Sequence, residues 1–209
     1  MSNDLSGKDL VSAGLPRSGS TLIYQTLKWL FPSARVRKVQ GFLEGVDYSL
    51  CVCSYRNFID ATISQARIDT NSKITSVDIK KAAKWIKKNV GDVKRYRDTG
   101  KCLMLNYSLF YNDYDYLFRN YSMYFKVSFC ETQTKSVRLQ SSLESNMRRA
   151  SLFKDFSEYD RETHIHGRHI KSPRPKEARK LVTLADIEFL RGYFEEDLKE
   201  FGYDESSKL

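Results

Sequence analysis

The residues best suited to chemistry lie near the N-terminus, in the segment G-L-P-R-S-G-S-T at residues 14–21. Its glycines have the spacing of the loop G-x-x-x-x-G-K-[ST], in which small residues let backbone N–H groups converge on an oxyanion. The lysine that reaches the terminal phosphates of ATP is replaced by Ser20, and Arg17 supplies a cation inside the loop instead. The segment therefore predicts a site for a smaller phosphate-type anion. The alternative is a chance Gly/Ser turn before a helix.

Apolar periodicity places this loop between a strand and a helix. Residues 8–14 read as a short strand, and leucine and isoleucine with helical spacing follow directly after the loop. We expect further strands at residues 35–39, 48–55 and 101–107. The run Y-S-L-C-V-C-S-Y is typical of a strand buried on both faces of a parallel sheet. These elements predict the α/β fold class, as a three-layer α/β/α domain with a central parallel sheet and a P-loop NTPase-like topology.

The rest of the chain is predicted to be mostly helical. We expect helices at residues 76–97, 114–125 and 131–149. A last helix begins after Thr183, which is a typical helix cap. The first of these helices has a lysine-rich face. Such a face is typically solvated, and the alternative is that it attracts the substrate or a polyanion. Residues 154–180 lose periodicity and gather basic residues, so we expect a mobile basic loop within a single domain of residues 1–209.

Composition limits the partners of the chain. The 209 residues carry 35 Lys and Arg against 26 Asp and Glu, a net charge of +9 and a pI near 9.3. This charge favours an anionic partner, but there are no zinc-finger ligands, RNP-type aromatic run or basic heptad region, which argues against nucleic acid. The sequence has neither a run of roughly 18 apolar residues nor a secretory signal. We therefore expect no membrane partner and a cytoplasmic location.

The cysteines predict structural thiols in a reducing compartment. They are too few, and too embedded in apolar runs, for a disulfide scaffold. Cys51 and Cys53 alternate along an expected strand and should pack on one face, whereas zinc sites favour C-x-x-C pairs. We expect these two, Cys102 and Cys130 to be buried.

Two motifs together resemble a known family. The loop G-L-P-R-S-G-S-T-L is similar to the 5′-phosphosulfate loop of the PAPS-dependent sulfotransferases, where PAPS is 3′-phosphoadenosine 5′-phosphosulfate. The segment S-Y-R-N-F-I-D-A-T-I-S at residues 54–64 is similar to the family's strand followed by R-[DN]-P-x-D-x-x-x-S. More weakly, L-M-L-N-Y-S-L-F at residues 103–110 is similar to the family's strand that ends in Y-E-D-L. The motifs stand in the family's order, which makes the pair far more specific than either motif alone.

The resemblance implies an enzyme that moves a sulfuryl group from PAPS to a hydroxyl or amine and releases PAP, without a metal. Arg17 would stabilise charge on the group in transfer. Arg56 and Ser64 would reach the 3′-phosphate, and Tyr107 would lie near the adenine. The 5′ end of the cofactor would be bound by Arg17 and by the loop residues Ser18, Gly19, Ser20, Thr21 and Leu22.

The general base is where the sequence departs from the family's pattern. Many members place a histidine at the end of the second strand, where this chain has Gln40, and a glutamine amide cannot serve as a base. Glu44 is our candidate for that role, and the alternative is that it is a solvated loop carboxylate. The histidines of the basic loop that could fold over the site instead are His164, His166 and His169.

The basic segment with which the family clamps the 3′-phosphate has no clear match here. Arg168 and Lys171 are our candidates for it. The run H-I-H-G-R-H lacks a nearby carboxylate or cysteine to complete a metal site. We expect a small-molecule, glycan or peptide acceptor, whose identity the sequence leaves open together with the oligomeric state. Two other functions stay open: a degenerate P-loop kinase that uses ATP and Mg²⁺, and a non-catalytic relative that binds anions or nucleic acid.

Overall fold

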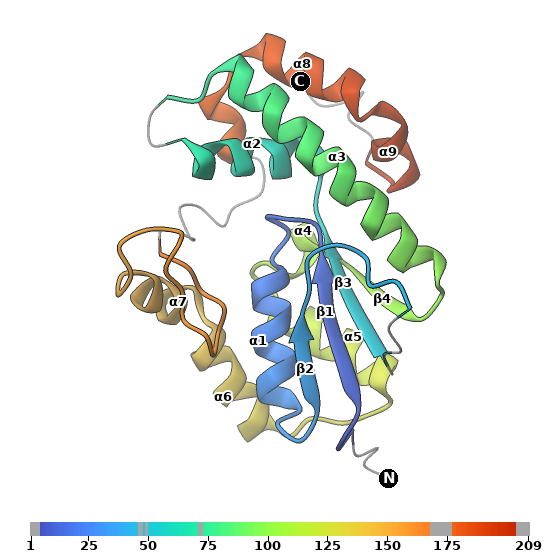
Figure 1. The fold of residues 1–209 in the computed structure, drawn as a ribbon. Helices are drawn as coiled ribbons and strands as arrows, with labels where there is room; N and C mark the ends of the chain where they lie inside the picture. The colour runs from blue at the N-terminus through green and yellow to red at the C-terminus, as the bar shows by residue number, and fades with distance from the viewer. Residues whose placement is uncertain (1–4, 46–47, 49, 71–72, 168–176, 204–209) are drawn as a thin grey trace.

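A computed structural model describes residues 5–45, 48, 50–70, 73–167 and 177–203. Its centre is a four-stranded parallel sheet with the strand order β2-β1-β3-β4 (Figure 1). The strands are β1 (Asp9–Gly14), β2 (Arg35–Lys38), β3 (Leu50–Tyr55) and β4 (Cys102–Asn106). In this register, Leu10 of β1 lies between Val36 of β2 and Leu50 of β3. The predicted α/β fold class with a central parallel sheet is confirmed.

Helices connect the strands and cover both faces of the sheet. The longer ones are α1 (Ser20–Leu30), α2 (Phe58–Asp69), α3 (Ser76–Asp98), α5 (Tyr114–Phe125), α6 (Glu131–Ser141) and α8 (Leu184–Tyr193). The shorter ones are α4 (Tyr107–Phe110), α7 (Leu143–Ala150), α9 (Glu195–Glu200) and the 3₁₀ turn η1 (Glu177–Leu181). Within the described part of the chain, no helix is both long and apolar enough to cross a lipid bilayer.

Two of the predicted helices are each divided in the structure. The helix expected at residues 131–149 is interrupted at Ser142, whose ψ of 154° is not helical and whose hydroxyl accepts a hydrogen bond of 3.1 Å from the Ser145 N–H to start α7. The last helix is divided at Phe194, between α8 and α9. Because Leu190, Phe194 and Leu198 keep helical spacing across this second break, periodicity does not reveal it.

Alternation along the strands divides the interior into two cores. In β3, Cys51 and Cys53 belong to the core that also contains side chains of α2, α3 and α8, whereas Val52 belongs to the core with α1 and α5. In β1, Val11 joins the first core and Leu10 joins the second. Both faces of the sheet are therefore covered, which gives the three α/β/α layers that the sequence predicts.

The cysteines follow this division only in part. Cys51 and Cys53 are buried, and the Cys51 sulfur lies 2.8 Å from the Cys102 sulfur on the next strand. The hydrogen bond from Cys102 and burial raise the pKa of the Cys51 thiol. The prediction that Cys130 is buried is wrong, because it precedes α6 as the N-cap residue and lies exposed outside both cores.

The chain after α7 folds into a compact turn, which we call the histidine turn (residues 155–167). The Asp160 N–H donates to the Ile165 carbonyl, and the His164 N–H donates to the Asp160 carbonyl, both at 2.8 Å. Tyr159 and His166 form an antiparallel bridge. This part of the predicted basic loop therefore has a defined backbone, although its sequence lacks the periodicity of a helix or strand.

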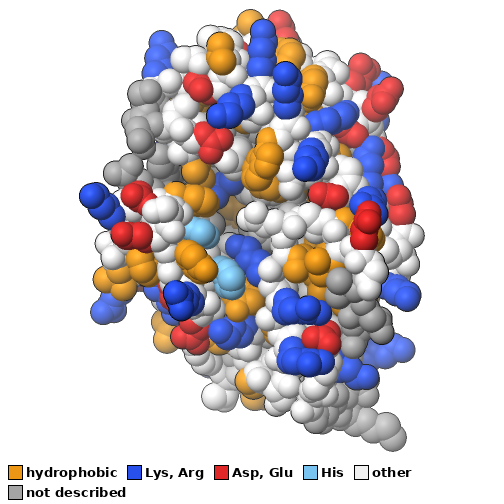
Figure 2. Space-filling view, in the orientation of Figure 1, with side chains coloured by type: hydrophobic (Ala, Val, Ile, Leu, Met, Phe, Trp, Pro, Cys, Tyr) orange, Lys and Arg blue, Asp and Glu red, His pale blue; other side chains and the backbone are white. Residues whose placement is uncertain are grey.

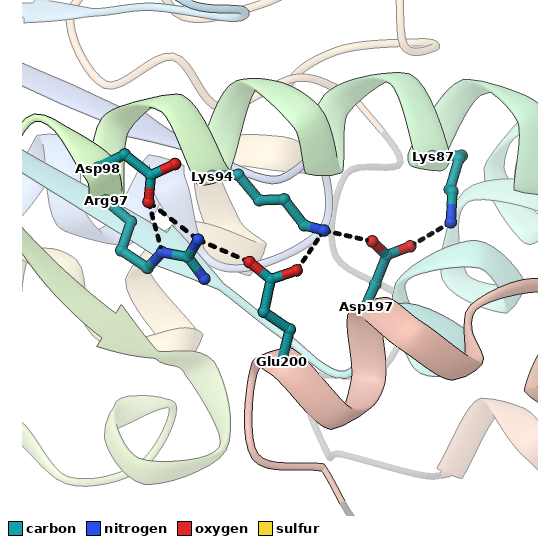
Figure 3. Close-up of polar contacts among 6 residues, drawn as sticks. All are labelled: Lys87, Lys94, Arg97, Asp98, Asp197 and Glu200. Carbon is teal, nitrogen blue, oxygen red and sulfur yellow. Dashed lines mark hydrogen bonds and ion pairs between the residues drawn. The ribbon is translucent and has the colours of Figure 1, made fainter.

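Charged side chains hold α9 against α3 (Figure 3). Asp197 is only 3% exposed, and it accepts hydrogen bonds from Lys87 at 2.5 Å and Lys94 at 2.7 Å. Lys94 also contacts Glu200, which pairs with Arg97 at 2.6 Å. Lys87 and Lys94, from the lysine-rich face of α3, therefore fix the C-terminal helix instead of being only solvated.

Replacing Asp197 with alanine should destabilise the domain, because Lys87 and Lys94 lose the buried carboxylate that compensates their charge. We expect the free energy of unfolding in urea to fall by about 1–3 kcal/mol. Glu195→Ala is the matched control on the same helix. Glu195 pairs with Lys199 at the surface, where ion pairs contribute little, so the urea midpoint should not change. Equal destabilisation by both variants would show that Asp197 does not hold α9 in place.

Candidate functional site

The loop between β1 and α1 is fixed from within by small residues. A Cβ atom at Gly14 would lie 2.3 Å from the Ser54 hydroxyl and 2.8 Å from the Ser54 carbonyl, so only glycine fits beside β3. The Ser18 hydroxyl lies 2.5 Å from the Leu15 carbonyl and 2.8 Å from the Ser54 hydroxyl, and the Ser18 N–H also donates to Leu15. The structure therefore does not support Ser18 as a phosphate ligand. The Ser18 hydroxyl and N–H group point into the loop, where they bond to Leu15 and Ser54.

The loop leads into the N-terminus of α1 through left-handed backbone at Arg17 (φ 67°) and Gly19 (φ 80°). Gly19 is the N-cap residue, and a Cβ atom there would lie 2.8 Å from the Tyr107 ring, so this position also requires glycine. The N–H groups of residues 20–22 belong to the first turn of α1, where N–H groups have no acceptor within the helix. That turn has no acidic residue, and no described side chain caps it. The positive end of α1 is therefore well suited to bind an anion.

Predicted site residues from distant parts of the chain meet beside this helix end. The Arg17 Nε donates to the Ser64 hydroxyl at 3.4 Å, and the Arg56 Nη1 donates to the Arg17 carbonyl at 3.4 Å. The guanidinium carbon of Arg56 lies 4.8 Å from the centre of the Tyr107 ring. Arg56 directly follows β3 and Ser64 lies within α2, so this strand-to-helix turn supplies both.

The start of α2 is held by a buried ion pair with the C-terminal part of the chain. The Asn57 side chain accepts a hydrogen bond of 3.0 Å from the Ile59 N–H and caps the helix. Asp60, which is 1% exposed, accepts a hydrogen bond of 2.6 Å from the Arg179 Nε. Arg179 thus holds η1 against the segment that positions Arg56, a structural role that the sequence did not distinguish from those of its basic neighbours.

Lys38 belongs to the site, although it was not among the predicted site residues. Its Nζ donates to the Thr21 hydroxyl at 2.6 Å. Lys38 is the last residue of β2, the neighbour of β1, so it leaves the sheet at the same edge as the loop after β1. A cation at the carboxyl end of a strand adjacent to the phosphate loop is the signal that could have identified it.

Burial, and then the crowding of positive charge, lowers the pKa values of these cations. Burial, and then the charge of Arg17, lowers the pKa of Lys38 to about 8. Burial, and then the charge of Arg56, lowers the pKa of Arg17 to about 10. Both groups are therefore less stable in their charged form here than in water, and a bound anion would offset that penalty.

The histidine turn packs along α1. The Gln25 side chain donates to the Thr163 carbonyl at 3.1 Å, and the Lys28 Nζ donates to the Glu162 carbonyl at 3.1 Å. One helix thus carries both the anion-binding N-terminus and the surface on which the histidine turn rests.

The histidines of this turn lie within electrostatic reach of Lys38. Burial, and then the charge of Lys38, lowers the pKa of His164, and the same two causes lower the pKa of His166. Figure 2 shows histidine side chains at the surface, close to Lys or Arg side chains on the same face. The histidine turn therefore lies against α1 with His164 and His166 close enough for the charge of Lys38 to act on them, which agrees with one of the alternatives that the sequence left open.

Glu44 is not brought to these cations. Its carboxylate is 73% exposed and pairs with Arg95 of α3 at 2.5 Å. The chain after β2 turns toward α3 because the Tyr96 hydroxyl donates to the Gly41 carbonyl at 3.2 Å and accepts from the Leu43 N–H at 3.3 Å. The geometry does not support Glu44 as the general base and agrees with the alternative of a solvated carboxylate.

Other candidates lie beyond what the structure describes. Arg168 and Lys171, predicted to clamp the 3′-phosphate, and His169 fall outside the described residues. Among the residues that are described, no group of three or more His, Cys, Asp or Glu side chains is placed to hold a metal ion. The site as described consists of cations, backbone N–H groups, the hydroxyls of Thr21 and Ser64, and aromatic and imidazole rings.

No protein-family model matches the sequence, and no curated protein matches it. The fold is nevertheless that of the sulfotransferases, a P-loop-like α/β fold. A solved structure that shows this is mouse sulfotransferase SULT7A1 complexed with PAP. The match covers 96% of this chain and 86% of that chain, with a TM-score of 0.66 and a sequence identity of 10%. At this identity the match establishes the fold, and the activity is a separate question.

The lowered pKa of Lys38 should make anion affinity fall as the pH rises. Between pH 7 and pH 9, Lys38 with its pKa of about 8 loses its proton, while Arg17 with its pKa of about 10 largely keeps its own. Inorganic sulfate does not titrate in this range, so we expect its affinity, measured by calorimetry, to fall by up to about tenfold. Lys38→Arg should keep its affinity across the range. An equal fall in that variant would show that another group is responsible.

Proposed function

We propose that this protein is a PAPS-dependent sulfotransferase, which transfers the sulfuryl group of PAPS to a hydroxyl or amine and releases PAP. The observation that supports this proposal best is the arrangement of two sets of side chains on a sulfotransferase fold. Arg17 and Lys38 lie at the start of α1. Arg56 and Ser64 lie beside α2, and both contact Arg17. The two sets suit a ligand with two separate anionic ends, a 5′-phosphosulfate and a 3′-phosphate. The PAP in the mouse sulfotransferase of the same fold supports this choice of ligand.

The residues at the start of α1 fit the phosphosulfate end. In our proposal, the N–H groups of residues 20–22 bind the 5′-phosphate, with the helix dipole in favour. Arg17 and Lys38 stabilise the negative charge that gathers on the bridging and equatorial oxygens when the sulfur–oxygen bond breaks. This donor set supplies the positive charge that a metal ion supplies in ATP-dependent phosphoryl transfer.

The residues beside α2 fit the nucleoside end. Arg56 is held between the Arg17 carbonyl and the Tyr107 ring, which fixes its guanidinium for bonding to the 3′-phosphate. Ser64 adds a hydroxyl, and its contact with the Arg17 Nε links the two ends of the site. Tyr107 is 8% exposed and supplies the ring for the adenine. The function of each residue here is a prediction that follows from the resemblance and the observed positions.

The acceptor is a hydroxyl or amine of a small molecule, a glycan or a peptide. Its attacking atom bonds to sulfur on the side opposite the bridging oxygen, and PAP leaves with the electron pair of the broken bond. The protein contributes by holding PAPS in a fixed orientation while the bond from sulfur to the bridging oxygen breaks. The cytoplasmic location stays a prediction.

A kinase that uses ATP and Mg²⁺ is the second candidate, because Lys38 places near Thr21 the ammonium group that the loop lacks at residue 20. This candidate requires affinity for a triphosphate and dependence on a metal ion. Sulfotransferase activity requires neither. The choice of nucleotide therefore separates the two functions.

Replacing Arg56 with methionine should remove the preference for a 3′-phosphate. We expect the unmodified protein to bind PAP without Mg²⁺ about 10–100-fold more tightly than 5′-AMP, because the additional phosphate makes charge-assisted hydrogen bonds. Calorimetry on Arg56→Met should show similar affinities for both nucleotides. Arg119→Met, which removes an exposed cation of α5, is the control and should keep the preference.

Because Arg56 is buried, the thermal midpoint of each variant is measured alongside to show that it is folded. An unchanged preference in a folded Arg56→Met variant would contradict the assignment of the 3′-phosphate. Binding of ATP with Mg²⁺ more tightly than PAP would contradict the proposed function.

A further inference from the structure

The histidine turn holds His166 in one tautomer. The His166 Nδ1 lies 2.8 Å from the Phe156 carbonyl oxygen. Because a carbonyl oxygen can only accept, Nδ1 of the neutral ring carries the hydrogen and Nε2 carries the lone pair. The imidazole also stacks on the Phe156 ring, with centroids 4.4 Å apart, and on the Tyr159 ring at 4.9 Å. One short segment thus fixes both the orientation and the protonation of this ring.

The backbone around His166 is tightly packed. The Gly167 N–H donates to the Glu158 carbonyl at 3.1 Å. A Cβ atom at Gly167 would lie 2.3 Å from the Asp155 carbonyl oxygen, so only glycine lets the two sides of the turn close. The antiparallel bridge between Tyr159 and His166 completes the closure. Such a turn presents its imidazole in a fixed place.

The buried Gln25 side chain attaches this turn to α1, and the Asn146 amide of α7 holds Gln25 in place. The Gln25 and Asn146 side chains exchange hydrogen bonds of 3.1 Å and 3.0 Å, and Gln25 also donates to the Thr163 carbonyl. Gln25 is 0% exposed and Asn146 is 6% exposed, so water does not compete for these bonds. Because α1 begins at the anion site, the attachment also fixes the turn relative to that site.

The charged groups that face His166 favour its neutral form. Burial lowers the pKa of His166, and the charges of Lys38 from β2 and Arg17 from the loop before α1 lower it further, against the opposing effect of the Phe156 carbonyl. His164, in the same turn, interacts with His166 as a like charge when both are protonated. A neutral imidazole with its lone pair on Nε2 is a competent base at neutral pH.

We propose that His166 is the general base of sulfuryl transfer and accepts the proton of the acceptor hydroxyl on Nε2, an inference that rests on the proposed function. As the acceptor oxygen bonds to sulfur, the bond from sulfur to the bridging oxygen breaks and its electron pair stays on PAP. The O–H proton moves to Nε2, and the imidazolium later releases it to water. His166 thereby fills the role for which Glu44 is misplaced and Gln40 is chemically unsuited.

The tautomer and the location of His166 are tested first, by nitrogen-15 NMR of the histidine side chains in the full-length chain. His166→Asn assigns the signal. We expect the pattern of a neutral ring with its hydrogen on Nδ1, and a shift of the signal on addition of PAP, because its phosphates add negative charge near Lys38 and Arg17. A hydrogen on Nε2, or no shift while calorimetry shows that PAP is bound, would overturn the inference.

The second test measures transfer from PAPS to 2-naphthol, a flat phenol chosen because the Phe156 and Tyr159 rings of the turn are 41% and 42% exposed. His166→Asn keeps an N–H donor for the Phe156 carbonyl but removes Nε2. We expect kcat to fall by about 10²–10⁴-fold with PAP affinity unchanged. The rise of kcat with pH through the range in which His166 loses its proton should disappear, and added imidazole should restore part of the rate.

Arg161→Asn is the matched control. Arg161 is an exposed residue of the same turn and is not among the groups assigned to the site. Its kcat and pH profile should stay close to those of the unmodified protein. An equal loss in both variants, without rescue by imidazole, would show that the turn has only a structural role.

The outcomes separate this inference from the proposed function. Where 2-naphthol is not accepted, hydrolysis of PAPS, with water as the acceptor, gives the same comparison. An unmodified protein that neither binds PAP nor releases it from PAPS contradicts the proposed function. An unmodified protein that transfers the sulfuryl group, while His166→Asn is equally active, overturns only the assignment of the base.

Discussion

The candidate site holds Arg17, Lys38 and Arg56 close together at the carboxyl end of a parallel sheet. Burial and like-charge repulsion both oppose this arrangement, so the surrounding structure has to maintain it. The lowered pKa values of Lys38 and Arg17 are the direct expression of this opposition. Contacts outside the cluster sustain it: Gly14 packs against β3, and the Ser18 hydroxyl closes the loop from within. The site is therefore built in advance of its ligand. A bound anion would stabilise the whole domain by mass action, because the unfolded chain does not assemble the cluster.

Sequence was sufficient for the parts of the site that lie within one strand-loop-helix unit. The glycine spacing at residues 14–21 predicted the loop, and the resemblance placed Arg56 and Ser64 at a second strand-to-helix turn, where the structure brings both beside Arg17. Such units carry their own signals, because apolar period, turn residues and helix start are all local. Lys38 and the histidines were harder. Their proximity to the loop after β1 depends on the order of the strands and on how a segment without periodicity packs on α1. Local residue spacing predicts neither of these.

The predictions that the structure does not support have the same physical origin. Glu44 follows β2 at a plausible distance, but bonds from Tyr96 turn the chain toward α3 and away from the cations. Ser18 has the right residue type for a phosphate ligand, yet its hydroxyl satisfies the loop itself. Cys130 follows the run F-K-V-S-F, but it lies exposed at the N-terminus of α6, outside both cores. For Glu44 and Ser18 the residue type was informative, but their contacts with Arg95 and Ser54 involve residues distant in sequence.

The buried amide pair between Gln25 and Asn146 has a consequence for how this protein can diversify. The pair joins α1 to α7, and Gln25 also donates to the Thr163 carbonyl of the histidine turn. The exposed side chains of Arg161 and Glu162 in that turn carry none of these buried bonds. Those side chains can vary in size and polarity without disturbing the rings of Phe156 and Tyr159, which stack on His166. The rim of the histidine turn is therefore a place where side chains can be exchanged while the attachment of the turn to α1 is kept.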